Sequence, residues 1–247
     1  MTKNQLKLFQ SLSRQKYRNQ YGQYLVEGAK NAVEWLQDAH VRIDAVIATE
    51  AWLSLHQALL AAHPEAQVFA AAAFELEKIT NMATATEVIL VAAMGSGQNA
   101  AAQQGWALLL ETIQDPGNMG TIIRTADWFG IGQIFVTGDC VDIYNPKVVQ
   151  ASMGSMLRVR IAEVEVAGFL AQNKLPIYAA CLGGTDLRNF HQPTPGVIAL
   201  GNESKGLSAA LAANATHRLA IPGAGGAESL NVAVAAGIIC AALTLRV

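Results

Sequence analysis

The sequence predicts an α/β protein in which strands and helices alternate along the chain. Short runs rich in Val, Ile and Leu recur throughout, and segments of helical length separate them. In the second half, three of these runs are followed by loops rich in Gly, Asn and Ser. Alternation of this kind favours a largely parallel sheet covered on both faces, and ligands bind such sheets beyond the carboxyl ends of the strands.

The first half of the chain predicts a small α/β domain over residues 1–94. YLVEG is a short apolar run that stops at a glycine, which is typical of a strand before a turn. Applied in chain order, the same reasoning gives strands at 24–28, 41–48, 67–69 and 87–93 and helices at 29–39, 50–61 and 73–80. A domain of this size can fold independently.

Residues 95–105, GSGQNAAAQQG, are the predicted linker, because they contain no charge and no periodic apolar face. The alternation then resumes and predicts a second domain over 106–247. Its expected strands are 106–113, 133–138, 156–161, 176–182, 196–201 and 217–221, and its expected helices are 117–129, 146–151, 166–172, 207–213 and a last one from about 229.

Composition narrows the class of protein. Apolar residues make up 52% of the 247 residues and charged residues only 15%, against about 25% in an average protein, so we expect a buried oligomer interface. No apolar run approaches the about 20 residues of a membrane span, and the first residues lack a secretory signal, which predicts a cytoplasmic protein. The three cysteines, Cys140, Cys181 and Cys240, are expected to be buried free thiols.

The N-terminal segment is basic although the whole chain has a net charge of −2. Tyrosines are interleaved with its cations, so the segment can contact phosphates and stack on bases. The alternative is an ordinary solvated helix. The candidate RNA-binding residues, all before the first acidic residue Glu27, are Lys3, Lys7, Arg14, Lys16 and Arg18.

The first of the three loops is QDPGNMGTIIRTADWFG, residues 114–130. Asp115 to Asn118 form a turn that starts a helix, and Asn118 is suited to cap it. Arg124 and Asp127 are three residues apart on that helix and can face the same way. The alternative is a helix cap followed by a surface ion pair.

The other two loops are LGNESKGLS, residues 200–208, and IPGAGGAESLN, residues 221–231. Glycines in the former let backbone groups approach a ligand closely, but the spacing is not that of a P-loop. The latter lacks the Rossmann glycine pattern and leads into the final helix, which Ser229 is expected to cap. A simple strand-to-helix turn is the alternative for 200–208, and capping of the helix by Ser229, which is compatible with a ligand role, is the alternative for 221–231.

The residue types in these loops indicate an adenosine ligand without phosphates. No loop concentrates Lys or Arg as a polyphosphate would require, and the five histidines show no metal-ligand spacing. Glycine loops with backbone donors and acceptors, flanked by apolar side chains such as Leu200, Ile221 and Leu230, suit S-adenosylmethionine. We therefore expect this cofactor and no metal.

Taken in order, NMGTIIRTADWFG, LGNESKGLS and IPGAGGAESLN followed by VAVAAGI resemble the three signature motifs of the SpoU (TrmH-like) branch of the SPOUT methyltransferases. NPKVVQASMGSMLRV, between the first two, also resembles that family. YLVEGAKNAVEWL resembles the start of the family's ribosomal-protein-like RNA-binding domain.

The resemblance implies a C-terminal domain tied in a deep trefoil knot, a homodimer, and transfer of a methyl group to a ribose 2'-hydroxyl of RNA. The cofactor would be bound by Leu182, Gly183, Leu200, Gly201, Asn202, Ile221, Ser229 and Leu230. The reacting end would be lined by Asn118, Arg124, Glu203, Ser229 and Asn231.

The same resemblance makes Arg124 the base that deprotonates the 2'-hydroxyl. A guanidinium stays protonated far above neutral pH, so stabilising a phosphate or a developing oxygen charge suits it better. Two other classes compete: an RNA-binding assembly factor that does not methylate, and a nucleotide-dependent oxidoreductase, which lacks its glycine fingerprint. The separate N-terminal domain favours ribosomal over transfer RNA as the substrate.

Overall fold

The computed structural model describes residues 1–82, 86–95, 104–191 and 193–245, which fall into two compact units. Unit 1 consists of Met1–Ser96 and Asp142–Leu157, and unit 2 of Gly97–Val141 and Arg158–Val247. Most of the predicted linker lies outside the described residues. The segment 142–157, which the sequence placed in the second domain, packs with unit 1 because Val149 and Tyr144 join its core.

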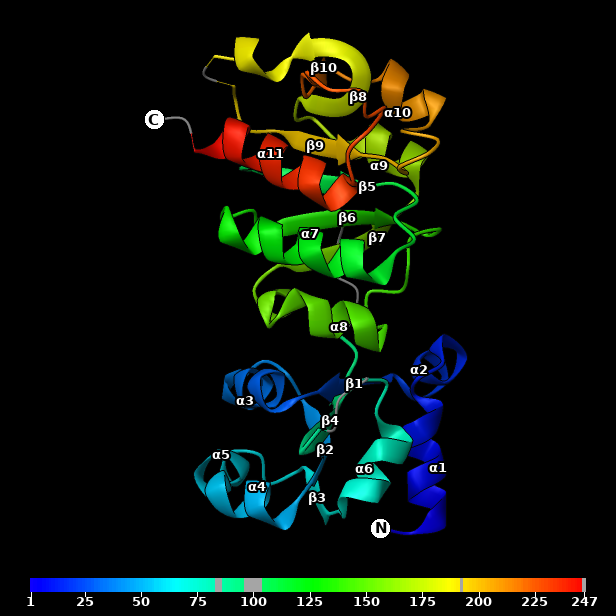
Figure 1. Ribbon diagram of the computed structural model, residues 1–247, viewed down its shortest axis with the longest axis vertical. Coiled ribbons are helices and arrows are strands. Elements are labelled where there is room, and N and C mark those ends of the chain that lie inside the picture. Colours follow the sequence, from blue (N-terminus) through cyan, green and yellow to red (C-terminus); the bar gives the residue numbers. More distant parts are fainter. Residues whose placement is uncertain (83–85, 96–103, 192, 246–247) are drawn as a thin grey trace. The chain divides into compact units, whose positions relative to one another are not determined.

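Unit 1 is built on a four-stranded sheet in the order β1-β4-β2-β3 (Figure 1). Only the β2–β3 pair is parallel, while β4 runs antiparallel to both β1 and β2, so the expected parallel arrangement does not hold here. The strands are β1 (Gln23–Glu27), β2 (Ile43–Ala48), β3 (Gln67–Ala70) and β4 (Val88–Ala93). The helices are α1 (Lys3–Ser11), α2 (Gln15–Tyr21), α3 (Ala29–Gln37), α4 (Glu50–Leu55), α5 (Gln57–Ala61), α6 (Ala73–Ile79) and α8 (Pro146–Ser152).

The two faces of this sheet are buried by different helices. Trp35 of α3 packs with Leu90 on one face, whereas Phe9 of α1 and Leu76 of α6 pack with Ile89 on the other. Adjacent residues of β4 therefore point to opposite cores, as the period of a strand requires. Helix α8 begins where the side chain of Asn145 accepts a hydrogen bond from the Lys147 amide at 3.0 Å, with proline as its first residue.

Unit 2 contains a six-stranded sheet in the order β10-β8-β9-β5-β6-β7, and every adjacent pair is parallel. This confirms the arrangement predicted for the second half. The strands are β5 (Ala107–Leu110), β6 (Gln133–Thr137), β7 (Arg160–Val164), β8 (Ile177–Asp186), β9 (Val197–Leu200) and β10 (His217–Ala220). The helices are α7 (Pro116–Trp128), α9 (Val166–Gln172), α10 (Ala209–Ala213) and α11 (Val232–Thr244), with short 3₁₀ turns at Ser155–Leu157 in unit 1 and Leu187–Asn189 in unit 2.

Helices cover both faces of this parallel sheet. Helices α7 and α11 pack against each other on one face (Figure 1), and α9 and α10 contact each other on the other face. Leu109 and Phe135 bury their side chains with Phe169 of α9 and Leu211 of α10. The result is a three-layer domain in which the strand ends are left to the loops.

Several predicted elements have different boundaries in the structure: the strand expected at 106–113 ends at residue 110, the strand expected at 176–182 extends to residue 186, and the helix expected at 50–61 is two helices, α4 and α5. The strand expected at 156–161 begins only at Arg160, because Ser155–Leu157 form a 3₁₀ turn. The last helix begins at Val232 rather than near Ser229, since Asn231 is its N-cap and accepts hydrogen bonds from the amides of Ala233 and Val234. Ser229 therefore does not cap this helix.

The three cysteines are free, as predicted, but only Cys240 is buried, while Cys140 and Cys181 are half-buried. Burial raises the pKa of the Cys240 thiol to about 12, which makes it unreactive at neutral pH. Within the described ranges, no helix is long and apolar enough to cross a membrane, and no group of His, Cys, Asp or Glu is arranged to hold a metal ion.

Candidate ligand and active site

The three glycine-containing loops meet at the carboxyl edge of the unit 2 sheet. Strands β5 and β9 are hydrogen-bonded neighbours, and each is followed directly by one of the loops. Strand β10, which precedes the loop 221–231, lies two strands from β9 across β8. Parallel strands place such loops on the same side of the sheet, so segments far apart in the sequence come together there.

A cluster of three polar side chains, one from each loop, lies at this edge. Asn118 donates its Nδ2–H to Glu203 Oε1 at 3.0 Å, and Asn231 donates to both Glu203 Oε1 and Asn118 Oδ1 at 3.0 Å. The backbone N–H of Val232 also donates to Glu203 Oε1, at 3.3 Å. We call Asn118, Glu203 and Asn231 the polar triad. Asn118 was expected to cap α7, but its side chain belongs to this triad and Asp115 is the N-cap residue.

The loop after β9 is tightly folded around Asn202. Its Oδ1 accepts hydrogen bonds from the amides of Ser204 and Lys205 at 3.0 and 3.2 Å, and its backbone carbonyl accepts one from Gly206 at 2.8 Å. Gly201 lies so close to the returning chain that a Cβ there would be 2.3 Å from the carbonyl carbon of Gly206. Only glycine fits this position, and the turn it permits presents Glu203 to the other two loops.

The residues that support this loop were not found by sequence reasoning. Asn202 Nδ2 donates to the carbonyl oxygen of Thr112 at 3.1 Å, and Thr112 has a φ of +58°, which is uncommon for a β-branched residue. The hydroxyls of Thr112 and Thr137 both donate to the carboxylate of Asp139. These bonds, that from Thr112 first, hold the pKa of Asp139 below its usual range.

A second support comes from Glu111, a buried carboxylate that accepts a hydrogen bond from the Ser208 amide at 2.6 Å. It ties the far end of the loop to β5. Polar residues placed directly after buried parallel strands were the available signal for Glu111, Thr112 and Asp139, because such residues lie at the ligand edge of the sheet.

The predicted cofactor residues lie around the same edge with different exposure. Leu200 is buried, Gly201, Asn202 and Ile221 are half-buried, and Ser229 and Leu230 are exposed. Leu182 and Gly183 lie in a stretch of β8 that does not pair with β10. Ala179 of β8 pairs with Arg218 of β10, but the next residue of β10, Leu219, pairs with Thr185. The side chain of Leu182 is consequently 82% exposed.

Arg124 is not part of the polar triad. It lies six residues after Asn118 on α7 and so on a different face of the helix. It is exposed, and no hydrogen bond or ion pair to its side chain exists among the described residues. The surface ion pair considered from the sequence does not form, because Asp127 pairs with Arg158 at 2.9 Å. Trp128, four residues after Arg124 and on the same face of the helix, is 83% exposed.

In the N-terminal basic segment, four of the five predicted cations are exposed: Lys3, Lys7, Arg14 and Lys16. Arg18 is the exception, with a side chain that is 2% exposed and bound to Asp142. Its Nη1 also donates to the carbonyl oxygens of Leu12 and Ser13 at 2.9 Å each. The prediction that Arg18 contacts RNA is therefore replaced by a structural role.

Comparison with known proteins gives matches to both units. The SpoU rRNA Methylase family profile matches residues 105–241, and the MRM3-like substrate binding domain profile matches residues 3–90. A solved TrmH-family protein from Porphyromonas gingivalis is 34% identical with a TM-score of 0.86, covering 100% of this chain and 99% of its own. An AdoMet-bound rRNA methyltransferase from Sinorhizobium meliloti is 28% identical with a TM-score of 0.87, covering 98% and 94%.

Among curated relatives, a 23S rRNA guanosine 2'-O-methyltransferase of Bacillus subtilis is 32% identical over 165 residues, 65% of this chain and 66% of its own. The matches span 50%, 66% and 50% of the lengths of three curated relatives. The fold defines a SPOUT-like α/β protein that carries an N-terminal substrate-binding domain. Because the family profile covers more than half of its residues, the chain belongs to the SpoU rRNA methylase family.

Proposed function

We propose that this protein transfers a methyl group from S-adenosylmethionine to a ribose 2'-hydroxyl of ribosomal RNA. The observation that carries the proposal is the polar triad, which joins the three family motifs into one site at the ligand edge of the parallel sheet. The named activities of the Bacillus subtilis and Sinorhizobium meliloti relatives support it.

The residues around the triad fit S-adenosylmethionine. Leu182 and Leu230 present exposed apolar surface for the adenine ring, and the exposed backbone of residues 222–230 offers donors and acceptors for its polar edges. Within the three loops, all of whose residues the structure describes, Arg124 and Lys205 are the only Lys or Arg residues, which is too few for a polyphosphate site. When bound, the cofactor supplies an electrophilic methyl group on a positively charged sulfur.

The triad and Arg124 have separate roles in this proposal. Asn118 and Asn231 orient Glu203, and the triad holds the three loops at the reacting end. When bound, the cofactor would supply its methyl group to the 2'-oxygen: the oxygen–methyl bond would form as the sulfur–methyl bond breaks, leaving the neutral thioether, and the hydroxyl proton would pass to water. Arg124 binds the phosphate next to the target ribose and stabilises the charge that develops on that oxygen.

Ribosomal RNA is preferred to transfer RNA as the substrate because unit 1 matches a substrate-binding domain. The test is mass-spectrometric mapping of ribose methylation in ribosomal and transfer RNA from cells with and without this protein. A ribosomal methyl group that disappears with the protein supports the proposal. An unchanged map, with no S-adenosylmethionine binding by calorimetry, favours a non-catalytic RNA-binding assembly factor.

A cytoplasmic homodimer with the trefoil knot of the family is also part of the proposal. Trp128 of α7 and Val234 and Ile238 of α11 are exposed apolar side chains on two helices that pack against each other. A second copy that covered them would approach Arg124, so the reacting end would lie beside the dimer interface. A mass of one chain in light scattering at micromolar concentration would contradict the dimer.

We expect Gly201→Ala to weaken S-adenosylmethionine binding. The new methyl group would lie 2.3–2.5 Å from the backbone of Gly206 and Leu207, so the loop must open. Overpacking of this kind costs about 1–3 kcal/mol, which corresponds to about a 5- to 150-fold higher Kd by calorimetry. Gly132→Ala is the control, because a Cβ there meets nothing within 4 Å. Equal affinities of both variants would contradict the predicted role of Gly201.

We expect Asp139→Ala to act on the same loop from a distance. It removes the acceptor that holds the Thr112 hydroxyl. Thr112 is then less firmly fixed, and so is its backbone carbonyl, to which Asn202 is bound. Loss of these hydrogen bonds should raise the Kd for the cofactor by about 3- to 10-fold. Glu165→Ala, which removes an exposed carboxylate that caps α9, should leave cofactor affinity unchanged. A Kd for Asp139→Ala equal to that of this control would show that Asp139 does not position the loop.

A further inference from the structure

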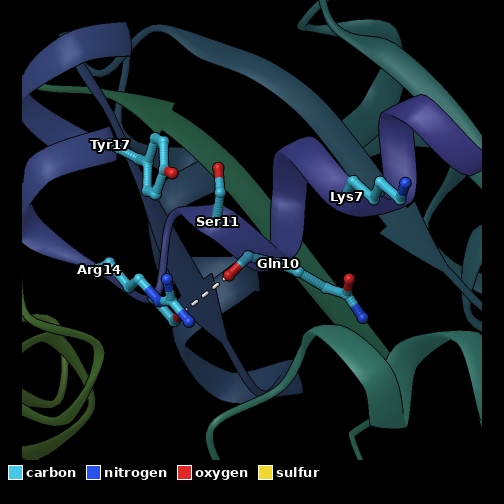
Figure 2. A pocket seen from close by; sticks show the side chains of 6 residues that line it. Lys7, Gln10, Ser11, Arg14 and Tyr17 are labelled. Atoms are coloured by element: carbon cyan, nitrogen blue, oxygen red, sulfur yellow. Dashed lines mark hydrogen bonds between the residues drawn. The ribbon is translucent and has the colours of Figure 1, made fainter.

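A small pocket lies in unit 1 between helices α1 and α2, and none of its lining residues belongs to the site described above. It has a volume of about 240 Å³ and is lined by Lys7, Gln10, Ser11, Ser13, Arg14 and Tyr17. Figure 2 shows Tyr17 and Arg14 on one side of it and Lys7 on the other, with Ser11 and Gln10 between them. Pockets for drug-sized ligands measure about 300–1,000 Å³, so this one accommodates a small unit of a polymer.

The pocket carries positive charge. Lys7 and Arg14 are exposed, and neither side chain has a hydrogen bond or an ion pair within the described part of the chain. Lys3 and Lys16 lie nearby in sequence, and no acidic residue precedes Glu27. Exposed lysine and arginine side chains that have no hydrogen-bond or ion-pair partner within the protein are suited to bind phosphate groups.

The two serine hydroxyls of the pocket are hydrogen-bond acceptors. The Ser11 hydroxyl donates its proton to the Leu8 carbonyl at 2.6 Å, and the Ser13 hydroxyl donates to the Gln10 carbonyl at 2.8 Å. Both oxygens can therefore only accept from a ligand. Gln10 Nε2 donates one of its two hydrogens to the Lys78 carbonyl at 3.0 Å, which leaves its second N–H as a donor and its Oε1 as an acceptor. Acceptors would disfavour a bare anion but suit a ligand that also has O–H or N–H donors.

Tyr17 adds an aromatic surface to this set. Its ring is half-buried and stacks with Tyr21 at a centroid distance of 6.4 Å and an interplanar angle of 13°. Tyr21 is 44% exposed, so the pair extends from the pocket to the surface. Aromatic side chains bind unpaired RNA bases by stacking, and this interaction tolerates any base.

We propose that this pocket binds one nucleotide of single-stranded RNA. Lys7 and Arg14 hold the phosphate, Ser11, Ser13 and Gln10 accept hydrogen bonds from the ribose hydroxyl and the base, and the base stacks on Tyr17. The inference rests on the proposed function in taking RNA as the substrate, but it concerns binding alone and requires no methyl transfer.

The test measures binding of the full chain to a fluorescein-labelled uridine RNA of about ten nucleotides by anisotropy. Tyr17→Ala should raise the Kd by about 5- to 100-fold, and Tyr17→Phe, which keeps the ring, should stay within about twofold of wild type. Lys7→Ala and Arg14→Ala should each lower the slope of log K against log salt by about 0.7. Lys30→Ala, an exposed lysine of α3 outside the pocket, is the control for charge.

Three results would overturn the proposal. One is a Tyr17→Ala variant that binds as well as Lys30→Ala. Another is equal affinity for the deoxyuridine strand of the same length, because DNA lacks the ribose hydroxyl. The third is displacement of the RNA by poly-glutamate at equal charge concentration, which would identify an acidic-peptide site.

Measurements of RNA binding and of cofactor binding together distinguish failure of the pocket proposal from failure of the proposed function. Calorimetry with S-adenosylmethionine on the same variants reports on unit 2, and we expect wild-type cofactor affinity for all of them. If the wild-type protein does not bind S-adenosylmethionine but Tyr17→Ala still weakens RNA binding, methyl transfer is refuted and the pocket proposal is not. Normal cofactor binding without Tyr17 dependence would refute the pocket alone.

Discussion

Arg124→Ala is expected to lower the rate of methyl transfer on the order of 10²- to 10³-fold while S-adenosylmethionine still binds. Removing one preorganised group that stabilises developing charge has effects of this size. Cofactor binding should persist because Arg124 is exposed on α7 and its side chain has no hydrogen bond to the polar triad among the described residues. Single-turnover methylation of substrate RNA and calorimetry with the cofactor measure the two quantities separately.

Further variants distinguish the possible roles of this arginine. Arg124→Lys keeps the charge but loses the forked donors, so we expect an intermediate rate. Added guanidinium ion should restore part of the activity of Arg124→Ala if the side chain acts by its charge. Arg160→Ala, an exposed arginine at the start of β7, is the control and should be fully active. A fully active Arg124→Ala enzyme would exclude both an electrostatic and a proton-transfer role.

Arg18→Ala is expected to destabilise unit 1 by about 3–5 kcal/mol. The guanidinium is 2% exposed and binds Asp142 through Nε at 2.9 Å and Nη2 at 2.5 Å. Its removal leaves a carboxylate that is 10% exposed without its partner, together with two carbonyl oxygens that lose their donors. Urea unfolding followed by tryptophan fluorescence measures the loss, because Trp35 and Trp52 are buried in unit 1.

Arg42→Ala is the matched control for this experiment. Arg42 pairs with Asp44 at 2.9 Å in the same unit, but its side chain is 72% exposed. Exposed pairs contribute about 0–1 kcal/mol. If Arg18→Ala lowers the free energy of unfolding no more than Arg42→Ala does, then burial does not make the Arg18–Asp142 pair more stabilising than an exposed pair.

The strongest sequence predictions were those that depend on local patterns. Alternating strands and helices are visible because strand and helix periods are short, and each of the ten strands expected overlaps one of the strands β1–β10 in the described part of the chain. The glycine loops after β5, β9 and β10 were also recognisable, since glycine and asparagine mark turns through their own backbone preferences. These signals, together with the order of the motifs, were enough to predict the family and the ligand edge.

Contacts between distant residues were decided only by the tertiary structure. Asn118 meets Glu203 across 85 residues and Asn231 across 113, and neither contact has a local signature. Strand direction in unit 1 was likewise invisible, because antiparallel and parallel strands share the same period. The position of Asp139 after a buried strand was a usable signal, but its hydrogen bond with Thr112 was not predictable, because Thr112 follows a different strand.

Arg18 shows the difference most clearly. The sequence by itself determined that the N-terminal segment is basic and rich in tyrosine, and four of its five cations are exposed. Whether a given cation contacts solvent or a buried carboxylate depends on which distant segment packs over it. Asp142, 124 residues further along the chain, supplies that carboxylate in unit 1. Desolvation and pairing are properties of the packed structure, so composition predicted the charge of this segment and only the fold assigned each charge its role.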